Sequence, residues 1–443
     1  MKLATCFSSR SRLAYDLKIM SIAADILVDG GHPISGTIKA SGAKNSVLKL
    51  MAASILAPGC ATISNVPTIS DVALMAEILR SMGITVDFDH QQASISIDTT
   101  DLANVCAPAG MVNQLRAGIA VLGPLLGRFH EAQVAVPGGC QIGERKLDIH
   151  FAALEALGME FYTDTEYIYA SAPGGLKGAH VPLRFPSNGA TENLMMAATL
   201  ADGTTVIDNA AREPEIVDLA DYLVSMGARI SGAGSPRIIV EGVQDLQPAD
   251  HHTIGDRIES GTFLTAGALL GGPVTVEGVN PDHLTTALLK FQQMGAQVDK
   301  TADSVTVSRD VSQKLRAVDI QTLPFPGFPT DLQAQFMVLA SLADGQSRLA
   351  ENIFESRFQH VVDLVNMGAD ITTDGHFAYV NGVSELTGAT VYSSDLRAGA
   401  ALVLAGLAAK GQTRVANTEH IDRGYEDFVA KLQSLGASII RES

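Results

Sequence analysis

The chain has 443 residues, of which 46% are hydrophobic and 18% charged, and it contains no Trp. This length and composition indicate about two to four globular domains, which excludes a single small module and a mainly disordered protein. Acidic residues outnumber basic residues by 48 to 31, for a net charge of −17. Such a surface is unsuited to coating nucleic acid or an acidic membrane. An anionic ligand must therefore be bound by a local basic cluster.

The lengths of the apolar runs and the spacing of the cysteines argue against a membrane-spanning protein and against a disulfide-rich or zinc-binding one. The longest strongly apolar run, residues 398–409, is well short of the ~20 residues that cross a bilayer, so we expect no membrane span. Cys6, Cys60, Cys106 and Cys140 are irregularly spaced and form no CxxC pair, which indicates neither a disulfide framework nor a zinc site. We expect a reducing compartment, the cytoplasm, and we expect Cys60 in the core within the strand-like segment CATISN.

The first 19 residues carry four basic side chains but no continuous apolar segment of the secretory type. Met20 stands directly before the first strand pattern. We therefore expect residues 1–19 to be an extension that is disordered or not translated. The alternative is a short organelle-targeting leader.

One sequence motif recurs six times along the chain: an apolar helical pattern, a Leu-Gly or Met-Gly pair, and an alternating strand pattern. Each glycine is suited to the position just after a helix, where the backbone is often left-handed. The glycines, roughly 70 residues apart as in a repeat protein, are Gly83, Gly158, Gly227, Gly295, Gly368 and Gly436.

A second sequence motif alternates with the first: a helix rich in Ala, Leu and Met, a glycine turn and a strand, as in residues 192–209. These helices are apolar on all sides, so we expect them to be buried. One unit cannot bury such a helix alone, which favours an α/β fold of two globules with three units each.

Loops before the apolar helices carry charges that packing does not require. Backbone N–H groups at helix N-termini favour anions, so these loops indicate a site at those helix ends. The charged and polar residues are Lys44 and Asn45 in SGAKNS, Arg116, Asp331 in FPTDLQ, and Asp395 and Arg397 in SDLRAG.

Three loops carry candidate chemistry, each with a simpler alternative. Cys140 lies in the glycine-rich segment PGGCQIGER, where nearby basic residues can lower a thiol pKa and create a nucleophile or acid, or it is a small hydrophobic residue at a turn. The segment FPSNGATEN, residues 185–193, begins a helix and either binds phosphate or caps that helix. Asp331 is either a general base or a helix cap.

The ordered motifs together resemble one family, the UDP-N-acetylglucosamine 1-carboxyvinyltransferases, enolpyruvyl transferases that begin peptidoglycan precursor synthesis. The resemblance covers about residues 25–440, as a homologous two-domain chain would. It implies two inside-out α/β barrel-like domains, each of three βαβαββ repeats: residues 20–43 with 254–443, and residues 44–253. The motifs are SGAKNS, PGGCQIGER, FPSNGATEN, NAAREPEIVDLA, GDRIESGTF, FPTDLQAQF, FESRFQH, SDLRAGAALVLAG and HIDRGYE.

The resemblance implies transfer of the enolpyruvyl group of phosphoenolpyruvate to the 3′-hydroxyl of UDP-N-acetylglucosamine, with release of phosphate and without metal or organic cofactor. Cys140 would protonate C3 of phosphoenolpyruvate or form an adduct with it, and Asp331 would act as acid and base near the sugar hydroxyl. We expect no nucleic-acid or membrane partner. The oligomeric state stays open, with a monomer as the expectation.

The family's binding residues can be assigned to positions of this sequence through the matching motifs. The implied phosphoenolpyruvate contacts are Lys44, Asn45, Arg145, Arg357, Arg397 and Arg423. The implied UDP-N-acetylglucosamine contacts are Arg116, Arg145, Lys146, Leu147, Asp148, Ile149, Phe185, Pro186, Ser187, Asn188, Asp331 and Ile353.

Three positions depart from the usual family pattern: Lys146 replaces a common proline, Arg184 a common acid, and Ser356 the usual Asn. They weaken the uridine and diphosphate assignments more than that of Cys140. Two alternatives stay open, a 5-enolpyruvylshikimate-3-phosphate synthase-like transferase and a catalytically silent paralogue that binds nucleotide sugar. Because both halves contribute cations, we also expect the domains to close on UDP-N-acetylglucosamine.

A reactive Cys140 thiol makes the chain a target of fosfomycin, an epoxide that alkylates the family's loop cysteine. We expect mass spectrometry to find one covalent adduct on the wild-type chain and none on Cys140→Asp. An unmodified wild-type chain, together with full activity of Cys140→Asp, would contradict the role assigned to the thiol.

Overall fold

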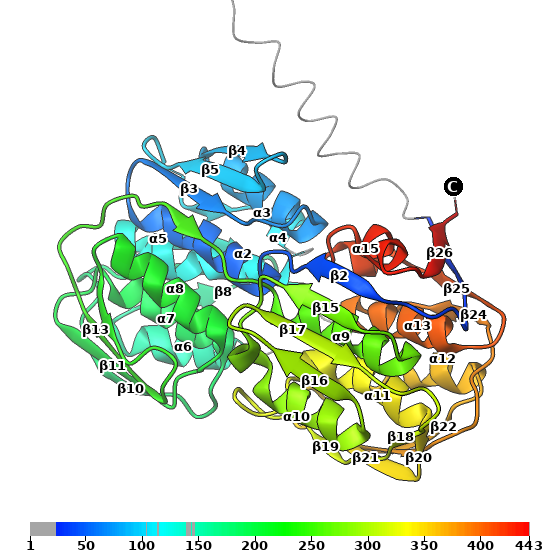
Figure 1. The fold of residues 1–443 in the computed structure, drawn as a ribbon. Helices are drawn as coiled ribbons and strands as arrows, with labels where there is room; N and C mark the ends of the chain where they lie inside the picture. The colour runs from blue at the N-terminus through cyan, green and yellow to red at the C-terminus, as the bar shows by residue number, and fades with distance from the viewer. Residues whose placement is uncertain (1–23, 103, 113–114, 139–142, 144–146, 443) are drawn as a thin grey trace, which may run out of the picture.

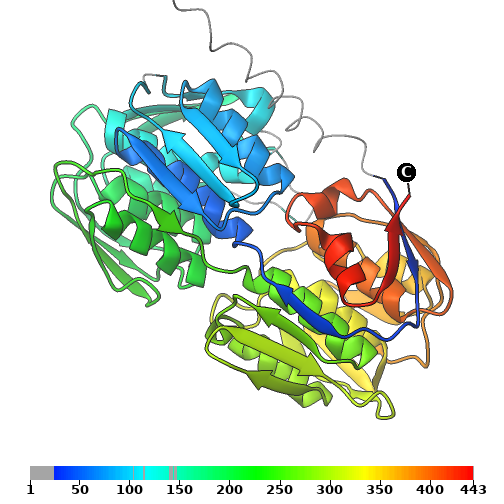
Figure 2. The same ribbon diagram turned by 45° about the horizontal axis from the view of Figure 1, so that its top comes forward.

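The computed structural model describes residues 24–102, 104–112, 115–138, 143 and 147–442; the predicted extension, residues 1–19, lies outside them. These residues form a two-domain α/β fold (Figures 1 and 2). Each domain has its own hydrophobic core. Core residues of the first domain lie within residues 47–246. Those of the second come from both ends of the chain, within residues 26–40 and 258–439. In Figure 2 the blue N-terminal strand lies among the green, yellow and red segments of the second domain.

Six four-stranded sheets share one topology: a parallel pair of strands continues into two antiparallel pairings. The first domain contains the sheets β14 (His251–His252), β3 (Cys60–Ser64), β5 (Ser94–Asp98), β4 (Thr85–Asp89); β6 (Cys106–Ala107), β7 (Glu131–Ala135), β9 (Tyr167–Ser171), β8 (Glu160–Thr163); and β10 (His180–Pro182), β11 (Thr204–Asp208), β13 (Arg237–Glu241), β12 (Arg229–Ser231).

The second domain repeats this topology three times and adds one short parallel pair. Its sheets are β2 (Gly36–Lys39), β15 (Val274–Glu277), β17 (Ser304–Ser308), β16 (Gln297–Lys300); β19 (Ile320–Gln321), β21 (Gln346–Ala350), β23 (Phe377–Asn381), β22 (Asp370–Asp374); and β24 (Thr390–Tyr392), β25 (Gln412–Ala416), β1 (Ile26–Asp29), β26 (Ser438–Arg441), with the pair β18 (Leu315–Arg316) and β20 (Ala343–Asp344). The six-unit α/β prediction is thereby confirmed.

One helix of each unit lies inside its domain, as the all-round apolar pattern predicts. In the second domain these helices contact one another, and each is buried along nearly its whole length. They are α2 (Lys44–Ala53), α5 (Leu122–Phe129) and α7 (Asn188–Ala198) in the first domain, and α9 (Arg257–Leu270), α11 (Gln333–Ser341) and α13 (Leu396–Ala408) in the second.

The remaining helices cover the outside of the two domains. They are α3 (Ser70–Ser81), α4 (Ala109–Val112), α6 (Asp148–Glu155), α8 (Pro214–Ser225), α10 (Thr285–Met294), α12 (Val361–Asn366), α14 (Glu419–Asp422) and α15 (Phe428–Ser434). Among the described residues, we find no helix with both the length and the apolar character needed to span a membrane.

The glycines that close the outer helices adopt the predicted conformation. All six have φ between 94° and 106°, a left-handed backbone that L side chains rarely adopt. Asn65, Asn209 and Asn417, which follow strands β3, β11 and β25, are also left-handed. The same asparagine turn is therefore built after the equivalent strand in three of the six units.

Two chain segments, residues 40–43 and 253–256, pass side by side between the domains. The amide of Ala43 donates to the carbonyl of Ile254 (2.7 Å), and the amide of Asp256 donates to the carbonyl of Ser41 (2.8 Å). Between these bonds Gly42 pairs with Gly255. A side chain at Gly42 would lie 1.7 Å from the carbonyl oxygen of Asn65, so this crossing requires glycine.

The prediction that Cys60 lies in the core is wrong. Cys60 begins β3 and is exposed, with its Sγ 3.2 Å from Oγ of Ser96. Ala61 and Ile63 provide the buried side of this strand, so the alternation of side chains turns Cys60 outward.

The left-handed backbone of the glycines that follow the outer helices leads to a prediction about stability. Gly83→Ala meets no atom within 4 Å but must hold φ near 94°, so we expect the free energy of unfolding to fall by about 1–2 kcal/mol. Gly110→Ala is the matched control, because Gly110 lies in α4 with equally open space, and there we expect a gain of about 0.4–1 kcal/mol. Urea denaturation measures both, and equal effects would contradict the backbone explanation.

Candidate active site

Asp71 joins two cations across the domain interface. Its Oδ2 lies 2.6 Å from Nζ of Lys44, and its Oδ1 lies 2.9 Å from Nε of Arg423. Asp71 belongs to α3 of the first domain, whereas Arg423 directly follows α14 of the second. The Asp71 side chain is only 4% exposed, whereas the side chain of Arg423 is 39% exposed. Lys44 is also the first residue of α2, where its amide donates to Asp256 (3.1 Å).

A second carboxylate, Asp331, joins two more cations. Its Oδ1 lies 2.9 Å from Nη2 of Arg357, and its Oδ2 lies 3.2 Å from Nη2 of Arg397. Both arginine side chains are 4% exposed, whereas Asp331 is 25% exposed. The Arg397 guanidinium also lies over the ring of Tyr425, 5.3 Å from its centre. Nη1 of Arg397 is buried and has no hydrogen-bond partner among the described residues.

Electrostatics connect the two pairings into one cluster. Burial lowers the pKa of Lys44, the charges of Arg397 and Arg423 lower it further, and Asp71 opposes the shift. Burial raises the pKa of Asp71, but Lys44 and Arg423 outweigh this effect and hold the pKa below its usual value. For Arg397, burial opposes protonation, yet Tyr425, Asp331 and Asp256 raise the pKa.

The charge balance of this cluster favours an anionic ligand. Among the described residues, the ion pairs of four cations, Lys44, Arg357, Arg397 and Arg423, use two carboxylates, so direct pairing leaves more cations than anions. Two of the cations also occupy the first turns of α2 and α13, where the helix dipole disfavours positive charge. Such an arrangement is costly without an anion, which both guanidinium groups and helix N-termini bind well.

Asp331 does not act as a helix cap in this structure. The residues that cap the 3₁₀ turn Thr330–Leu332 and α11 are Pro329 and Leu332, and neither makes a side-chain capping bond. The carboxylate of Asp331 accepts from the two arginines instead. Asp395, in contrast, does cap α13 by accepting from the amides of Arg397 and Ala398.

The predicted nucleotide contacts form a second group, at the N-termini of α6 and α7. Asp148 and Arg184 form an ion pair that joins the two loops. Ser187 caps α7, with its Oγ accepting from the amide of Ala190 at 3.4 Å. Phe185 and Asn188 are exposed at the same end, Pro186 and Ser187 are half-buried, and Leu147 and Ile149 are half-buried in the neighbouring loop. Ser187 is therefore a helix cap, the simpler of the two alternatives for this segment.

His150 is a functional candidate that the sequence did not single out. It is 7% exposed, and both ring nitrogens lack a hydrogen-bond partner among the described residues. A Cβ atom on Gly189 would lie 2.7 Å from Nε2 of His150, so this histidine contacts the first turn of α7. Burial, followed by the charge of Arg116, lowers the pKa of His150 to about 4, and the ring is neutral at neutral pH. Arg116 itself is half-buried at the start of a 3₁₀ helix.

Two other predicted contacts have defined surroundings. Asn45 is exposed at the start of α2, and its carbonyl accepts from Nζ of Lys49 (3.0 Å). The amide of Ile353 donates to Oε1 of Glu351 (2.9 Å), so a backbone contact from Ile353 to a ligand would have to use its carbonyl. Glu351 is buried, and no sequence pattern singled it out.

Cys140, Arg145 and Lys146 lie outside the described residues. Between them Gly143 is described, with φ of 139°. A Cβ atom there would lie 2.5 Å from Oε2 of Glu355, a residue of the second domain. At Gly143 the chain of the first domain therefore touches the second domain.

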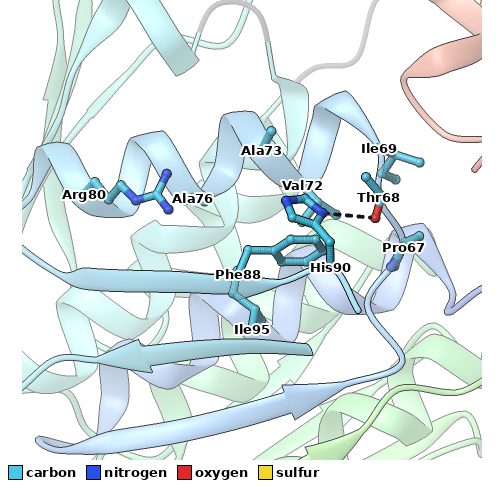
Figure 3. A pocket seen from close by; sticks show the side chains of 10 residues that line it. All are labelled: Pro67, Thr68, Ile69, Val72, Ala73, Ala76, Arg80, Phe88, His90 and Ile95. Carbon is cyan, nitrogen blue, oxygen red and sulfur yellow. Dashed lines mark hydrogen bonds between the residues drawn. The ribbon is translucent and has the colours of Figure 1, made fainter. Parts of the chain in front are cut away.

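A small pocket opens elsewhere, between α3 and the sheet of β4 and β5 (Figure 3). Its walls are mostly apolar, and none of the predicted site residues that are described lines it. Its one guanidinium, from Arg80, is engaged with the carbonyl of Val86 and with Glu77. The charged cluster, not this pocket, is therefore the candidate active site. Among the described residues, no group of acidic, His and Cys side chains is arranged to hold a metal ion.

This chain is similar to enolpyruvyl transferases over nearly its whole length. The family model of EPSP synthase (3-phosphoshikimate 1-carboxyvinyltransferase) matches residues 28–432. UDP-N-acetylglucosamine 1-carboxyvinyltransferase of Nocardia farcinica is 51% identical over 419 residues, covering 94% of this chain and 98% of the relative. The protein of the same name from Corynebacterium jeikeium is 50% identical over 415 residues, with coverage of 94% and 98%.

Solved structures show the same fold. The enolpyruvyl transferase NikO from Streptomyces tendae superposes with a TM-score of 0.85 at 26% identity, covering 94% of this chain and 98% of that chain. EPSP synthase from Acinetobacter baumannii has a TM-score of 0.75 at 17% identity, covering 95% and 100%. At that identity the second likeness concerns the fold alone.

The buried Asp71 makes a pH-dependent stability prediction. Because its pKa is lowered in the folded chain, its ion pairs stabilise the fold above the unfolded pKa of about 4 and are lost as pH falls through the folded pKa. We expect Asp71→Asn to lower the free energy of unfolding at pH 7 by about 3 kcal/mol or more, because it removes the charged partner that Lys44 and Arg423 share. The gap between wild type and variant in urea denaturation should shrink below pH 4, and a constant gap would contradict this account.

Proposed function

We propose that this chain, which belongs to the UDP-N-acetylglucosamine 1-carboxyvinyltransferase family, transfers the enolpyruvyl group of phosphoenolpyruvate to the 3′-hydroxyl of UDP-N-acetylglucosamine. The observation that carries the proposal is the cluster of Lys44, Arg357, Arg397 and Arg423, in which the two arginines Arg357 and Arg397 are buried and, among the described residues, two carboxylates form the ion pairs. A small ligand with both a phosphate and a carboxylate would neutralise this cluster. We place the reaction in the cytoplasm and expect a monomer.

Phosphoenolpyruvate would bind where the two domains meet. Arg397 offers a buried Nη1 that has no hydrogen-bond partner among the described residues. Its Nη2 donates to Asp331. Guanidinium groups bind carboxylate and phosphate in a fixed plane, which would orient the reacting double bond. Asn45 and Arg145 complete the proposed contacts. Binding would also replace the repulsion between cations of the two domains with attraction, which favours closure.

Asp331 would change role when the anion binds. Before binding, its two carboxylate oxygens accept hydrogen bonds from Arg357 and Arg397. When the substrate's anionic groups engage these arginines, the carboxylate of Asp331 would give up those hydrogen bonds and turn to the sugar hydroxyl as its proton acceptor. The base would thus be activated only when the substrate is in place.

The reaction then follows from two proton transfers. Asp331 takes the proton of the 3′-hydroxyl as the hydroxyl oxygen bonds to C2 of phosphoenolpyruvate, and the thiol of Cys140 protonates C3. The resulting tetrahedral adduct still carries phosphate on C2. The C2–O bond to phosphate then breaks as Cys140 recovers a proton from C3, and the departing phosphate takes the proton from Asp331. General acid and base transfers of this kind are typically worth ~10²–10⁴-fold in rate.

The nucleotide sugar would extend from Asp331 toward the N-termini of α6 and α7. Residues 147–149 and 185–188 are brought together there by the Asp148–Arg184 ion pair. The turn before α7 offers backbone N–H groups to the diphosphate. Arg116, close enough to shift the pKa of His150, would add a positive charge. Lys146 and Ile353 are the remaining proposed contacts.

Phosphate release from phosphoenolpyruvate tests the proposal. We expect release that depends on UDP-N-acetylglucosamine and that falls by ~10²–10⁴-fold in Cys140→Ala and in Asp331→Ala. Arg229→Ala is the matched control, because Arg229 is an exposed surface residue, and it should leave the rate unchanged. Release with shikimate-3-phosphate instead would identify the sister activity. No release with either acceptor would favour a silent nucleotide-sugar-binding protein.

A further inference from the structure

Asp331 stands at the end of a loop, residues 322–331, that is braced at its base. Glu351, which is 1% exposed, accepts from the hydroxyls of Thr322 and Thr330, each at 2.9 Å. Within the loop, the amide of Leu323 donates to the carbonyl of Phe328 (3.0 Å). These hydrogen bonds join the two ends of the loop, and Asp331 directly follows Thr330 at its base.

The tip of this loop contacts the first domain. The amide of Phe325 donates to Oε1 of Glu213 (3.3 Å), and Glu213 directly precedes α8 of the first domain. The Phe325 ring lies 5.7 Å from the guanidinium of Arg257. Phe325 is therefore held at both its backbone and its side chain.

Arg257 is itself fixed across the interface. It begins α9 of the second domain and forms a two-point contact with Glu215 of α8, with distances of 3.0 and 3.3 Å. Arg257, Glu215 and Glu213 are each no more than 8% exposed. The site chemistry described above uses none of these three, although they lie in NAAREPEIVDLA and GDRIESGTF, two of the motifs that carry the family resemblance.

We propose that Glu213 is a positioning residue for Asp331, acting across the domain interface through the amide of Phe325. The inference rests on the proposed function, because it assigns Asp331 the acid and base role. The Glu213 contact forms only when α8 of the first domain lies against the loop tip. Asp331 would therefore reach its working position only when the two domains are together, which couples domain closure to the proton transfer.

A side-chain series at Glu213 tests this coupling in the full chain. Glu213→Ala removes the acceptor of the Phe325 amide, Glu213→Asp shortens its reach, and Glu213→Gln keeps an acceptor oxygen of the same length. Asp221→Ala is the matched control, since Asp221 is an exposed acid on the same helix α8. The readouts are kcat and both KM values from phosphate release, and hydrogen exchange of a peptide that contains Phe325.

We expect Glu213→Ala to lower kcat by about 10- to 100-fold, the cost of a catalytic group displaced by roughly 1 Å. Both KM values should stay within about threefold, because the lost contact acts on the transition state rather than on binding. Glu213→Gln should stay near wild type, Glu213→Asp should be intermediate, and the Phe325 amide should exchange faster in Glu213→Ala but not in Asp221→Ala. If Glu213→Ala fails to fold, the drop in kcat of Glu213→Asp decides.

Three results would overturn the inference: an unchanged kcat in Glu213→Ala, equal losses in Glu213→Ala and Glu213→Gln, or a parallel loss in Asp221→Ala. A wild-type chain that releases no phosphate would instead reject the proposed function. In that case the exchange measurement still decides whether Glu213 holds the loop of Asp331. Faster exchange in Glu213→Ala alone would support the tether, and unchanged exchange would reject it.

Discussion

Two shared carboxylates make the centre of this molecule possible. Like charges 4 Å apart repel by about 4 kcal/mol in partly buried surroundings, so four cations drawn from two domains could not meet unaided. Asp71 and Asp331 each take two of them and thereby hold the cluster together. Neither neutralises its pair completely. The remaining positive charge is what an anionic substrate would use, so the ion pairs that hold the two domains together here also prepare the cluster for binding.

The repeated architecture explains why charges so distant in sequence can meet. Every unit buries one apolar helix, and the helices of a domain pack against one another or against neighbouring turns. Residues placed at the starts of these helices, such as Lys44 on α2 and Arg397 on α13, are brought to the interface by packing alone. The repeat is thus a scaffold on which individual units carry different chemical groups.

Much of this could be predicted from the sequence, because the determining signals are local. A helix that is apolar on all sides and a glycine after a Leu or Met both describe a short stretch of chain, and both predictions are confirmed. Asp71 was missed for the opposite reason. An acid in the first turn of a helix is common, and what distinguishes Asp71 is Arg423, a partner 352 residues away. His150 and Glu213 were missed in the same way, since their burial and their neighbours come from other units. Cys60 was misplaced because the register of its strand, not its apolar character, decides which way it points.

The pairing of β1 also determines when each domain can form during synthesis. The first domain is made from one continuous stretch and has all its strands once His252 has been added. β1, although made earlier, pairs with β25 and β26, whose residues are among the last to be joined. A folded first domain must therefore exist for a time beside an unpaired N-terminal strand and a growing, incomplete second domain. Exposed strand edges of this kind pair readily with wrong partners, so the second domain is the part of the chain most exposed to mispairing during synthesis.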